Sequence, residues 1–400
     1  MDSRRKFIGR VASGLAGSLA VPSSVLGANE RIRIGVIGAG DRGIQLAREA
    51  LAAGGAQLTG FADIYPRRLE LAKSVCPSAG SYSDYRALLD DRDTDAVLIA
   101  TPQHLHGRHL LAALESGKHV YLEKTMAFTV DEAKRVRDAC ARAKGLTVQV
   151  GHQWCSSGLY ADAARFLASG GMGKITAVHA HMYRNTPRGK PQWSRPVYPD
   201  MRPGEIEWEA FLGDAPQREF DSNRLANWRL FWDYSGGGVF EHLSQQLAFW
   251  YKALDLQIPG VVSMLGGIHL WRDGREVPDT MSVAMHHGEE LILSWDSGFG
   301  NSQLGTSEEV LGTDGTISRG QQIRYLPQKV NLPDATEALG QTKTSPVAHL
   351  ADYLECIRTG KAPNCPAELG YRVSVACRMA VESYRQGRTV RWDPAREEIL

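Results

Sequence analysis

The chain carries, near its start, the segment Ile32-Arg33-Ile34-Gly35-Val36-Ile37-Gly38-Ala39-Gly40-Asp41-Arg42-Gly43. Residues 32–37 are rich in β-forming side chains, and a Gly-x-Gly-x-x-Gly motif follows them directly. Residues 44–53 then continue with a helical pattern. A strand, a glycine-rich turn and a helix in this order predict the first unit of a dinucleotide-binding Rossmann fold.

Each position of the motif has a separate physical task. Gly38 permits the tight turn, Gly40 lets the backbone approach a pyrophosphate, and Gly43 lets the helix pack closely on the strand. The N-terminus of the following helix attracts anions. We therefore expect this loop, including Asp41 and Arg42, to bind the phosphates of a dinucleotide.

The second expected strand, residues 57–62, ends at Asp63. A carboxylate at this position can accept hydrogen bonds from both ribose hydroxyls of NAD and repels a 2′-phosphate. The sequence therefore favours NAD. Because Arg67 and Arg68 follow closely, NADP stays open as the alternative.

The alternation of strands and helices continues along the first 150 residues. Expected strands are 95–100, 119–122 and 146–150, and expected helices are 106–116 and 130–143. Such alternation predicts a doubly wound parallel sheet, which we assign to a first domain, residues 29–150. Ligands of these sheets bind beyond the carboxyl ends of the strands. The candidate cofactor residues at those ends are Gly38, Asp63, Thr101, Pro102, Glu123 and Gln153.

Composition excludes several other classes of protein. The chain has 400 residues, which favours two domains, and its formal net charge of +1 gives no field that would attract nucleic acid. Its six cysteines form no Cys-x-x-Cys pair and no zinc-type cluster with histidine, so we expect free thiols and no metal.

The first 28 residues have the pattern of an export signal. Arg4 and Arg5 precede Phe7-Ile8 and a short, weakly apolar run from Val11 to Leu26. This order resembles a twin-arginine signal, and the run is too short for a stable membrane span. We therefore expect a folded protein, carried by the twin-arginine machinery to the periplasm or the medium.

The motifs of both halves resemble the Gfo/Idh/MocA family, named for glucose–fructose oxidoreductase and inositol dehydrogenase. The resemblance covers essentially the whole chain after the signal. It rests, in order, on residues 38–43, Asp63, Thr101-Pro102-Gln103-His104-Leu105-His106, Gly117-Lys118-His119-Val120-Tyr121-Leu122-Glu123-Lys124, and Gly236-Gly237-Gly238 followed by an acid.

The resemblance implies a nicotinamide-dependent oxidoreductase that acts on a sugar-like substrate. Lys124 would lie beside the nicotinamide and hydrogen-bond the reacting hydroxyl or carbonyl, while Gln103 and His106 would line the nicotinamide side. The Glu-Lys-Pro of the family becomes Glu123-Lys124-Thr125 here, which keeps the lysine.

Residues 151–400 read as a second, α+β domain. A helix is expected over 160–169, and strands over 174–183, 261–270, 280–287 and 290–297, which together indicate a large, mostly antiparallel sheet. Helices over 347–358 and 370–385 should cover the sheet edge or pack back on the first domain. An exposed sheet face would favour a dimer or tetramer.

Two segments of this half are candidates for the substrate site. Alternation in the first strand puts His181 and Tyr183 on one face, which borders either the crevice or the core. The Pro-rich, aromatic residues 184–202 read as a docking arm or a site rim. Tryptophans between Trp193 and Trp250 suit stacking on sugar faces. The candidate substrate contacts are Lys124, His181, Tyr183, Arg184, Trp228, Arg229, Glu241 and Gln245.

One departure from the family bears on catalysis. In the family the glycine run leads to an acid and, four residues later, a histidine, and these two assist proton transfer. Here the two positions hold Glu241 and Gln245, and glutamine cannot take a proton. His242 is adjacent to Glu241 but lies about 100° around an α-helix. Lys124 and Glu241 are therefore the candidate catalytic residues.

Three functions remain open at this point. The first is a sugar or cyclitol dehydrogenase that uses Lys124 and Glu241. The second is an enzyme that retains its NAD in an internal redox cycle, either recycling the cofactor or cleaving a glycoside; export favours it, because free NAD is scarce outside the cytoplasm. The third is a sugar-binding protein without activity on the same fold.

Overall fold

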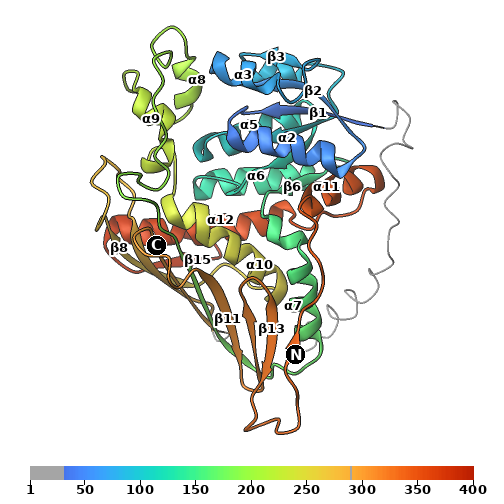
Figure 1. Ribbon diagram of the computed structural model, residues 1–400, viewed down its shortest axis with the longest axis vertical. Coiled ribbons are helices and arrows are strands. Elements are labelled where there is room, and N and C mark those ends of the chain that lie inside the picture. The colour runs from blue at the N-terminus through green and yellow to red at the C-terminus, as the bar shows by residue number, and fades with distance from the viewer. Residues whose placement is uncertain (1–30, 289–290) are drawn as a thin grey trace.

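The computed structural model describes residues 31–288 and 291–400, so the expected signal segment lies outside the described residues. Two sheets form the frame, one of six strands and one of ten. In Figure 1 the six-stranded sheet and its helices lie above, and the ten-stranded sheet lies below.

The first sheet has the predicted parallel, doubly wound form. Its strand order is β3-β2-β1-β4-β5-β6, and every neighbouring pair is parallel. The strands are β1 (Ile32–Ile37), β2 (Ala56–Ala62), β3 (Gly80–Tyr82), β4 (Ala96–Ile99), β5 (His119–Leu122) and β6 (Val148–Val150). The central strand β4 is apolar and fully buried because helices cover both of its faces.

Alternate side chains of these strands enter two separate cores. One face packs against α5 (His106–Glu115) and α6 (Val130–Arg142), and the other against α2 (Asp41–Ala53) and α11 (Ala348–Thr359). Two short helices complete the domain, α3 (Pro66–Ala72) and α4 (Tyr85–Leu89). The second half of the chain thus contributes α11 to the first domain.

The second sheet is mostly antiparallel, as predicted. Its order is β14-β13-β12-β11-β7-β10-β9-β8-β15-β16, and one internal pair, β7 with β10, is parallel. The strands that the sequence predicted are β7 (Ile175–Tyr183), β8 (Val261–Gly267), β9 (Thr280–His286) and β10 (Ile292–Gly298). Those that it did not predict are β11 (Thr306–Gly312), β12 (Gly315–Arg319), β13 (Ile323–Pro327), β14 (Ala338–Leu339), β15 (Val390–Asp393) and β16 (Glu398–Ile399).

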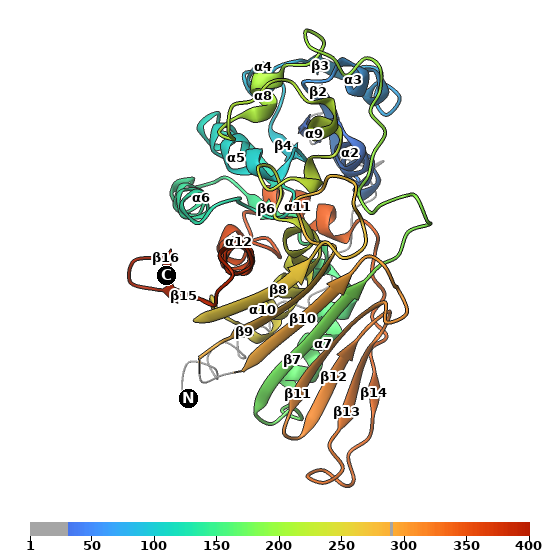
Figure 2. The same cartoon turned by 90° about the vertical axis from the view of Figure 1, so that its left-hand side faces the viewer.

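Helices cover one face of this sheet, namely α7 (Gly158–Ala168), α10 (Ser244–Leu254) and α12 (Ala367–Gln386). Val178, Ala180 and Met182 of β7 point into that core, and His179 between them is exposed. Figure 2 shows α12 between the two sheets, where it contacts both β8 and α6. The opposite face carries no helix in the part of the chain that the structure describes.

A separate cap lies beside the first domain (Figures 1 and 2). It contains α8 (Trp208–Leu212) and α9 (Ser222–Ala226) and has its own apolar cluster, to which Tyr65 of the first domain contributes. The chain reaches it from β7 through residues 184–207, which we call the arm. The arm therefore joins the second sheet to the cap.

Candidate active site

The glycine loop has the conformation that a phosphate-binding turn requires. Gly38 has a φ of +91°, and a Cβ there would lie 2.8 Å from the Ala100 carbonyl oxygen. A Cβ at Gly43 would overlap the Gly38 carbonyl oxygen. At Gly40, by contrast, the first atoms that a Cβ would meet belong to Arg68 at 3.9 Å, so space is open above the loop. That open space at the start of α2 fits a dinucleotide pyrophosphate.

Asp63 follows β2 and is 7% exposed. One of its carboxylate oxygens accepts from the backbone N–H of Ala39 at 2.8 Å, and the other from Tyr65 at 2.9 Å. Each oxygen keeps a free lone pair, because a carboxylate offers about four acceptor sites. Asp63 is thus fixed beside the loop and can still accept from ribose hydroxyls.

We expect Asp63→Ala to weaken NADH binding about tenfold or more, because charge-assisted hydrogen bonds to the ribose are lost. NADPH binding should weaken less, since the repulsion of the 2′-phosphate is lost too. Fluorescence titration with both nucleotides measures the change, and Asp63→Asn serves as the control that retains one acceptor. Wild-type protein that binds NADPH more tightly than NADH would contradict this assignment.

Arg42 does not point at the phosphate space. Its Nε donates to Glu123 at 2.7 Å, and its Nη1 donates to the Gln153 amide oxygen at 3.2 Å once that amide is turned toward it. Burial opposes the charge of Arg42, but the Glu123 carboxylate outweighs burial and raises the pKa of Arg42. Arg42, Glu123 and Gln153, which were all predicted to contact the cofactor, are therefore linked to each other through the Arg42 guanidinium. The side chain of Asp41 is 84% exposed.

The residues that follow β4 divide into two groups. Gln103 faces the crevice: its Nε2 donates to Glu241 at 3.0 Å, and its oxygen accepts from the backbone of Gly236 at 3.1 Å. His106 faces inward, 1% exposed, with its ring nitrogens 2.9 and 2.7 Å from the carbonyl oxygens of Thr101 and Thr125. His106 therefore holds the backbone on either side of the crevice, and burial lowers its pKa.

The centre of the site is the pair Lys124–Glu241. Lys124 Nζ lies 2.6 Å from Glu241 Oε2 and 3.2 Å from the Glu241 carbonyl oxygen, and the two side chains are 11% and 10% exposed. The other carboxylate oxygen accepts from Arg229 Nε at 2.9 Å. Burial works against ionisation, but Lys124 and Arg229 outweigh it and lower the pKa of Glu241 to about 2.

His242 is a site residue that the sequence reasoning set aside. Residues Val239–Leu243 form a π-helix, η5, that continues into α10, so the α-helical angle between Glu241 and its neighbour does not apply. His242 packs against Trp193 of the arm at 5.5 Å and Phe299 at 5.6 Å between ring centroids. Its buried Nδ1 has no hydrogen-bond partner among the described residues. No signal in one sequence separates a π-turn from an α-turn.

Burial and then the charge of Arg184 lower the pKa of His242 to about 3, while Glu241 acts in the opposite direction. The imidazole is therefore neutral near pH 7, with Lys124, Arg184 and Glu241 close enough to influence it. Trp228 is 9% exposed, and the Arg229 guanidinium lies over its ring at 4.1 Å.

Two expected substrate contacts lie elsewhere. His181 and Tyr183 alternate with the buried Ala180 and Met182, so they occupy the sheet face opposite to the helices that carry Glu241. His181 Nε2 instead lies 3.0 Å from the Leu304 carbonyl oxygen. The crevice interpretation of this strand face is therefore wrong, because the even-numbered side chains of β7 face α10.

Gln245 lies one turn after Glu241, at the start of α10. Its Oε1 is buried and has no hydrogen-bond partner in the described chain. Its neighbour Gln246 instead enters the core of the second domain, where its oxygen accepts from Trp295 at 2.6 Å.

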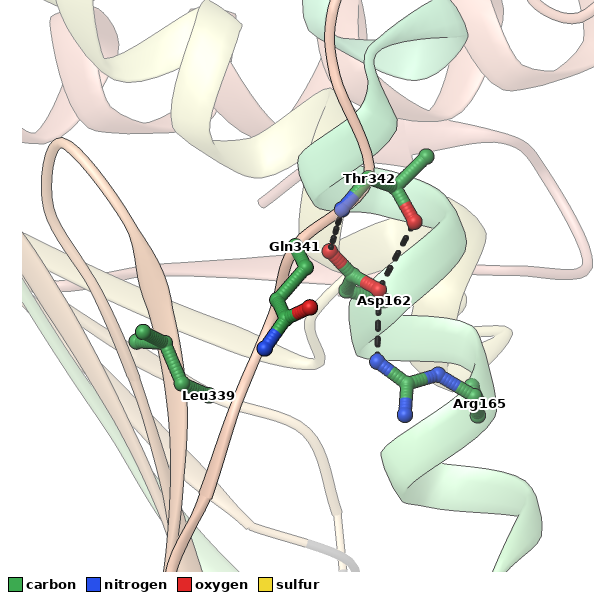
Figure 3. Close-up of a pocket in the computed structure, with 5 residues that line it drawn as sticks. All are labelled: Asp162, Arg165, Leu339, Gln341 and Thr342. Carbon is green, nitrogen blue, oxygen red and sulfur yellow. Dashed lines mark hydrogen bonds and ion pairs between the residues drawn. The ribbon is translucent and has the colours of Figure 1, made fainter.

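A hollow between α7 and the segment after β14 is shown in Figure 3. The Asp162 carboxylate accepts from Arg165 at 2.6 Å and from the Thr342 backbone and hydroxyl at 3.0 and 2.9 Å. Leu339 and Gln341 complete the lining. Its charged groups already pair with each other, so this hollow holds no candidate catalytic group.

The described residues contain no cluster of His, Cys, Asp or Glu that could hold a metal ion. Within the same residues, no helix is long and apolar enough to cross a bilayer. The six cysteines are free thiols.

Comparison with known proteins agrees with this geometry. Residues 32–152 match the Gfo/Idh/MocA model, described as an oxidoreductase family with an NAD-binding Rossmann fold. The chain is similar to 1-carboxy-3-chloro-3,4-dihydroxycyclo hexa-1,5-diene dehydrogenase of Comamonas testosteroni, with 32% identity over 152 residues. That match spans 38% of this chain and 38% of the relative, which is less than half of either.

A longer match is weaker in identity. The scyllo-inositol 2-dehydrogenase (NAD(+)) of Bacillus subtilis (strain 168) is 24% identical over 387 residues, which cover 92% of this chain and 98% of that protein. Among solved structures, levoglucosan dehydrogenase in complex with NADH and levoglucosan has a TM-score of 0.69 at 18% identity and covers 90% of this chain and 99% of its own. The two-domain fold is therefore shared over nearly the whole described chain.

Proposed function

We propose that the protein is an NAD-dependent dehydrogenase of a sugar or cyclitol hydroxyl, on the premise that residues 32–152 match the NAD-binding Rossmann domain of the Gfo/Idh/MocA oxidoreductases. The observation that carries the proposal is the buried Lys124–Glu241 pair at the carboxyl edge of the first sheet. The pair lies where the strands of the first sheet end, which is the edge at which such sheets bind dinucleotides and their substrates.

Lys124 is proposed to hold the reacting oxygen. An ammonium has three N–H donors, and the carbonyl and carboxylate oxygens of Glu241 take two of them. The third can donate to the substrate hydroxyl and to the negative charge that develops on it. When bound, the nicotinamide supplies the acceptor of a hydride from the substrate carbon. The glycine loop and Asp63 would hold the rest of the cofactor.

Glu241 is proposed to position Lys124 rather than to take the proton. Its two carboxylate oxygens already accept hydrogen bonds from Lys124, Arg229 and Gln103, and its carboxylate stays ionised at neutral pH. The buried Nδ1 of the neighbouring His242 has no hydrogen-bond partner among the described residues, so His242 is the proposed acceptor of the hydroxyl proton. The family histidine that Gln245 replaces would then have a substitute three residues earlier in the chain.

The decisive experiment is to incubate the purified protein with NAD and a panel of inositols, hexoses and anhydrosugars and to follow NADH absorbance. Formation of NADH with at least one polyol, lost in Glu241→Gln, is the expected result. Protein that binds neither NAD nor NADP would overturn the proposal.

The arm favours a second candidate, an enzyme that retains its NAD through an internal redox cycle. Arg195 of the arm lies 3.0 Å from Asp41 of the glycine loop, and Asp200 accepts from the Tyr65 hydroxyl at 2.8 Å. A dinucleotide beneath these contacts would leave slowly. Mass spectrometry of denatured protein tests this candidate, because a retained cofactor is released only on denaturation.

We further propose export by the twin-arginine pathway and a dimer or tetramer formed through the open face of the ten-stranded sheet. Leu265 and Ile292, on the strands of that sheet, are 75% and 51% exposed. Sedimentation of the mature protein tests the assembly.

Changing Arg4 and Arg5 together to lysine should leave folded, active protein in the cytoplasm. The paired arginines ahead of a weakly apolar run are the feature that the twin-arginine machinery reads. Fractionation with a cytoplasmic marker measures the change, and Arg10→Lys in the same segment is the matched control. Undiminished export of the double variant would remove the assignment.

A further inference from the structure

The site carries more positive than negative charge. Lys124 and Arg229 share the single carboxylate of Glu241, and Arg184 brings a third cation to the same corner. His242 adds no charge because it is neutral near pH 7. Among the groups that the structure describes around this corner, two positive charges are left without a counter-ion.

Arg184 is held at this corner by its backbone. Its N–H donates to the Gly298 carbonyl oxygen at 2.9 Å, directly before Phe299, which packs on His242. The described contact of its side chain is a weak one, Nη2 to Met182 Sδ at 4.0 Å. Its guanidinium is exposed and exerts the largest effect of any single charge on His242.

Arg229 also has donors to spare. Only its Nε is used on Glu241, at 2.9 Å, so both terminal nitrogens are without acceptors in the described chain. Its guanidinium lies over the Trp228 ring, 4.1 Å from the ring centroid. Two guanidinium groups, one over an indole ring and one free, thus face the space next to Lys124.

We propose that the substrate is an anionic sugar derivative, whose carboxylate or phosphate group is bound by Arg184 and Arg229 while Lys124 holds the reacting hydroxyl. The inference rests on the proposed dehydrogenase function and narrows its substrate class. Guanidinium groups match carboxylates and phosphates in a planar, two-pronged geometry.

The physical reason is the cost of desolvation. A substrate that covers the crevice removes water from Arg184, and a buried, unpaired charge is strongly unfavourable. A neutral sugar would leave that cost uncompensated, whereas an anionic group offsets it with charge-assisted hydrogen bonds. Trp193 and Phe299 offer an apolar wall for the C–H face of the ring.

Neutralising Arg184 has a consequence for the proton acceptor. The charge of Arg184 is one cause of the lowered pKa of His242, and a bound anion removes that effect. His242 thus becomes a better base when the anionic substrate is bound.

The test uses matched probes on protein loaded with NADH: glucose, galactose and mannose, their uronates and their 6-phosphates. Calorimetric titration should show an anionic member binding at least tenfold more tightly than its neutral parent. Uronates and phosphates are titrated separately, so the class that binds more tightly identifies the anionic group of the substrate. Arg184→Gln should abolish the preference and leave NADH affinity unchanged, while Arg184→Lys should keep part of it. Arg188→Gln, an exposed arginine of the same arm, is the control.

Neutral sugars that bind as tightly as their anions overturn the proposal, and so does a panel in which no anion binds. Equal weakening of both classes by Arg184→Gln, or weaker NADH binding, overturns it as well. Oxidation of neutral sugars by the Arg184→Gln variant would leave the dehydrogenase function intact. Failure of the wild type to bind NADH would remove that function instead.

Discussion

Lys124→Ala is expected to reduce turnover by about 10²–10³-fold, the loss that follows removal of one donor to an oxygen on which negative charge develops. NADH affinity should stay nearly unchanged, because the glycine loop and Asp63 lie on other strands. Initial rates on any polyol that the wild type oxidises measure the first effect, and fluorescence titration with NADH measures the second.

The variant also removes one cation from Glu241, so its fold needs a check. Arg229 and Gln103 still donate to the carboxylate at 2.9 and 3.0 Å, which should keep it ionised and paired. Lys144→Ala, the same deletion at an exposed lysine, is the matched control. If Lys124→Ala retains full activity, the reacting oxygen is held elsewhere.

The pH dependence of turnover tests whether Glu241 takes part in proton transfer. Because the folded pKa of Glu241 is lowered to about 2, its ionised form is favoured by folding, and that contribution is lost only as pH falls toward 2. Between pH 5 and 9 the charge of Glu241 is therefore constant, and any titration in the rate must come from another group.

The first domain was predictable from sequence because local and global signals agree there. The run Ala96–Ile99 is apolar at every position, and both of its faces are buried. The glycines stand where the backbone needs them, as at Gly38 with its φ of +91°. No long-range information is needed to interpret such a segment.

The strands after β10 were not predictable in the same way. β11 reads Thr-Ser-Glu-Glu-Val-Leu-Gly, and Glu308, its third residue, is completely buried. A strand is recognised by alternating polarity, in which charged residues lie on the solvent face. A charged residue at the buried position 308 breaks that pattern, so the strand is not recognised from the sequence. Only the distant partners of that carboxylate, Arg319 and Trp250, explain its position.

The site shows the same division. The order of the strands brings Lys124 and Gln103 to one edge, and the glycine run brings Glu241, all of which follow from sequence position. The face that His181 occupies depends on which side of β7 packs on α10, which is a tertiary property. His242 depends on a π-turn, where one extra residue per turn changes which side chains face the crevice.

The buried pair Glu308–Arg319 contacts α10, the helix that continues directly from the π-helix with Glu241. The Arg319 Nη2 lies 2.5 Å from the Glu308 carboxylate, which also accepts from Trp250 Nε1 at 3.2 Å and from Gln246 of α10. The guanidinium lies between the rings of Trp154 and Phe249, at 4.3 Å from each centroid. The side chain of Arg319 is 4% exposed and that of Glu308 is 0% exposed.

Arg319→Ala should therefore destabilise the second domain by about 3–5 kcal/mol, because it leaves the Glu308 charge buried without its counter-ion. Urea unfolding followed by tryptophan fluorescence reports this directly, since Trp250 and Trp154 contact the network. The double variant Glu308→Leu/Arg319→Met should recover most of the loss, because removal of both charges also removes the desolvation cost. Arg324→Ala, which breaks an exposed pair with Glu337, should cost less than about 1 kcal/mol. If Arg319→Ala costs no more than Arg324→Ala, the pair does not hold β11 and β12 against α10, and the position of Glu241 must be set by other contacts.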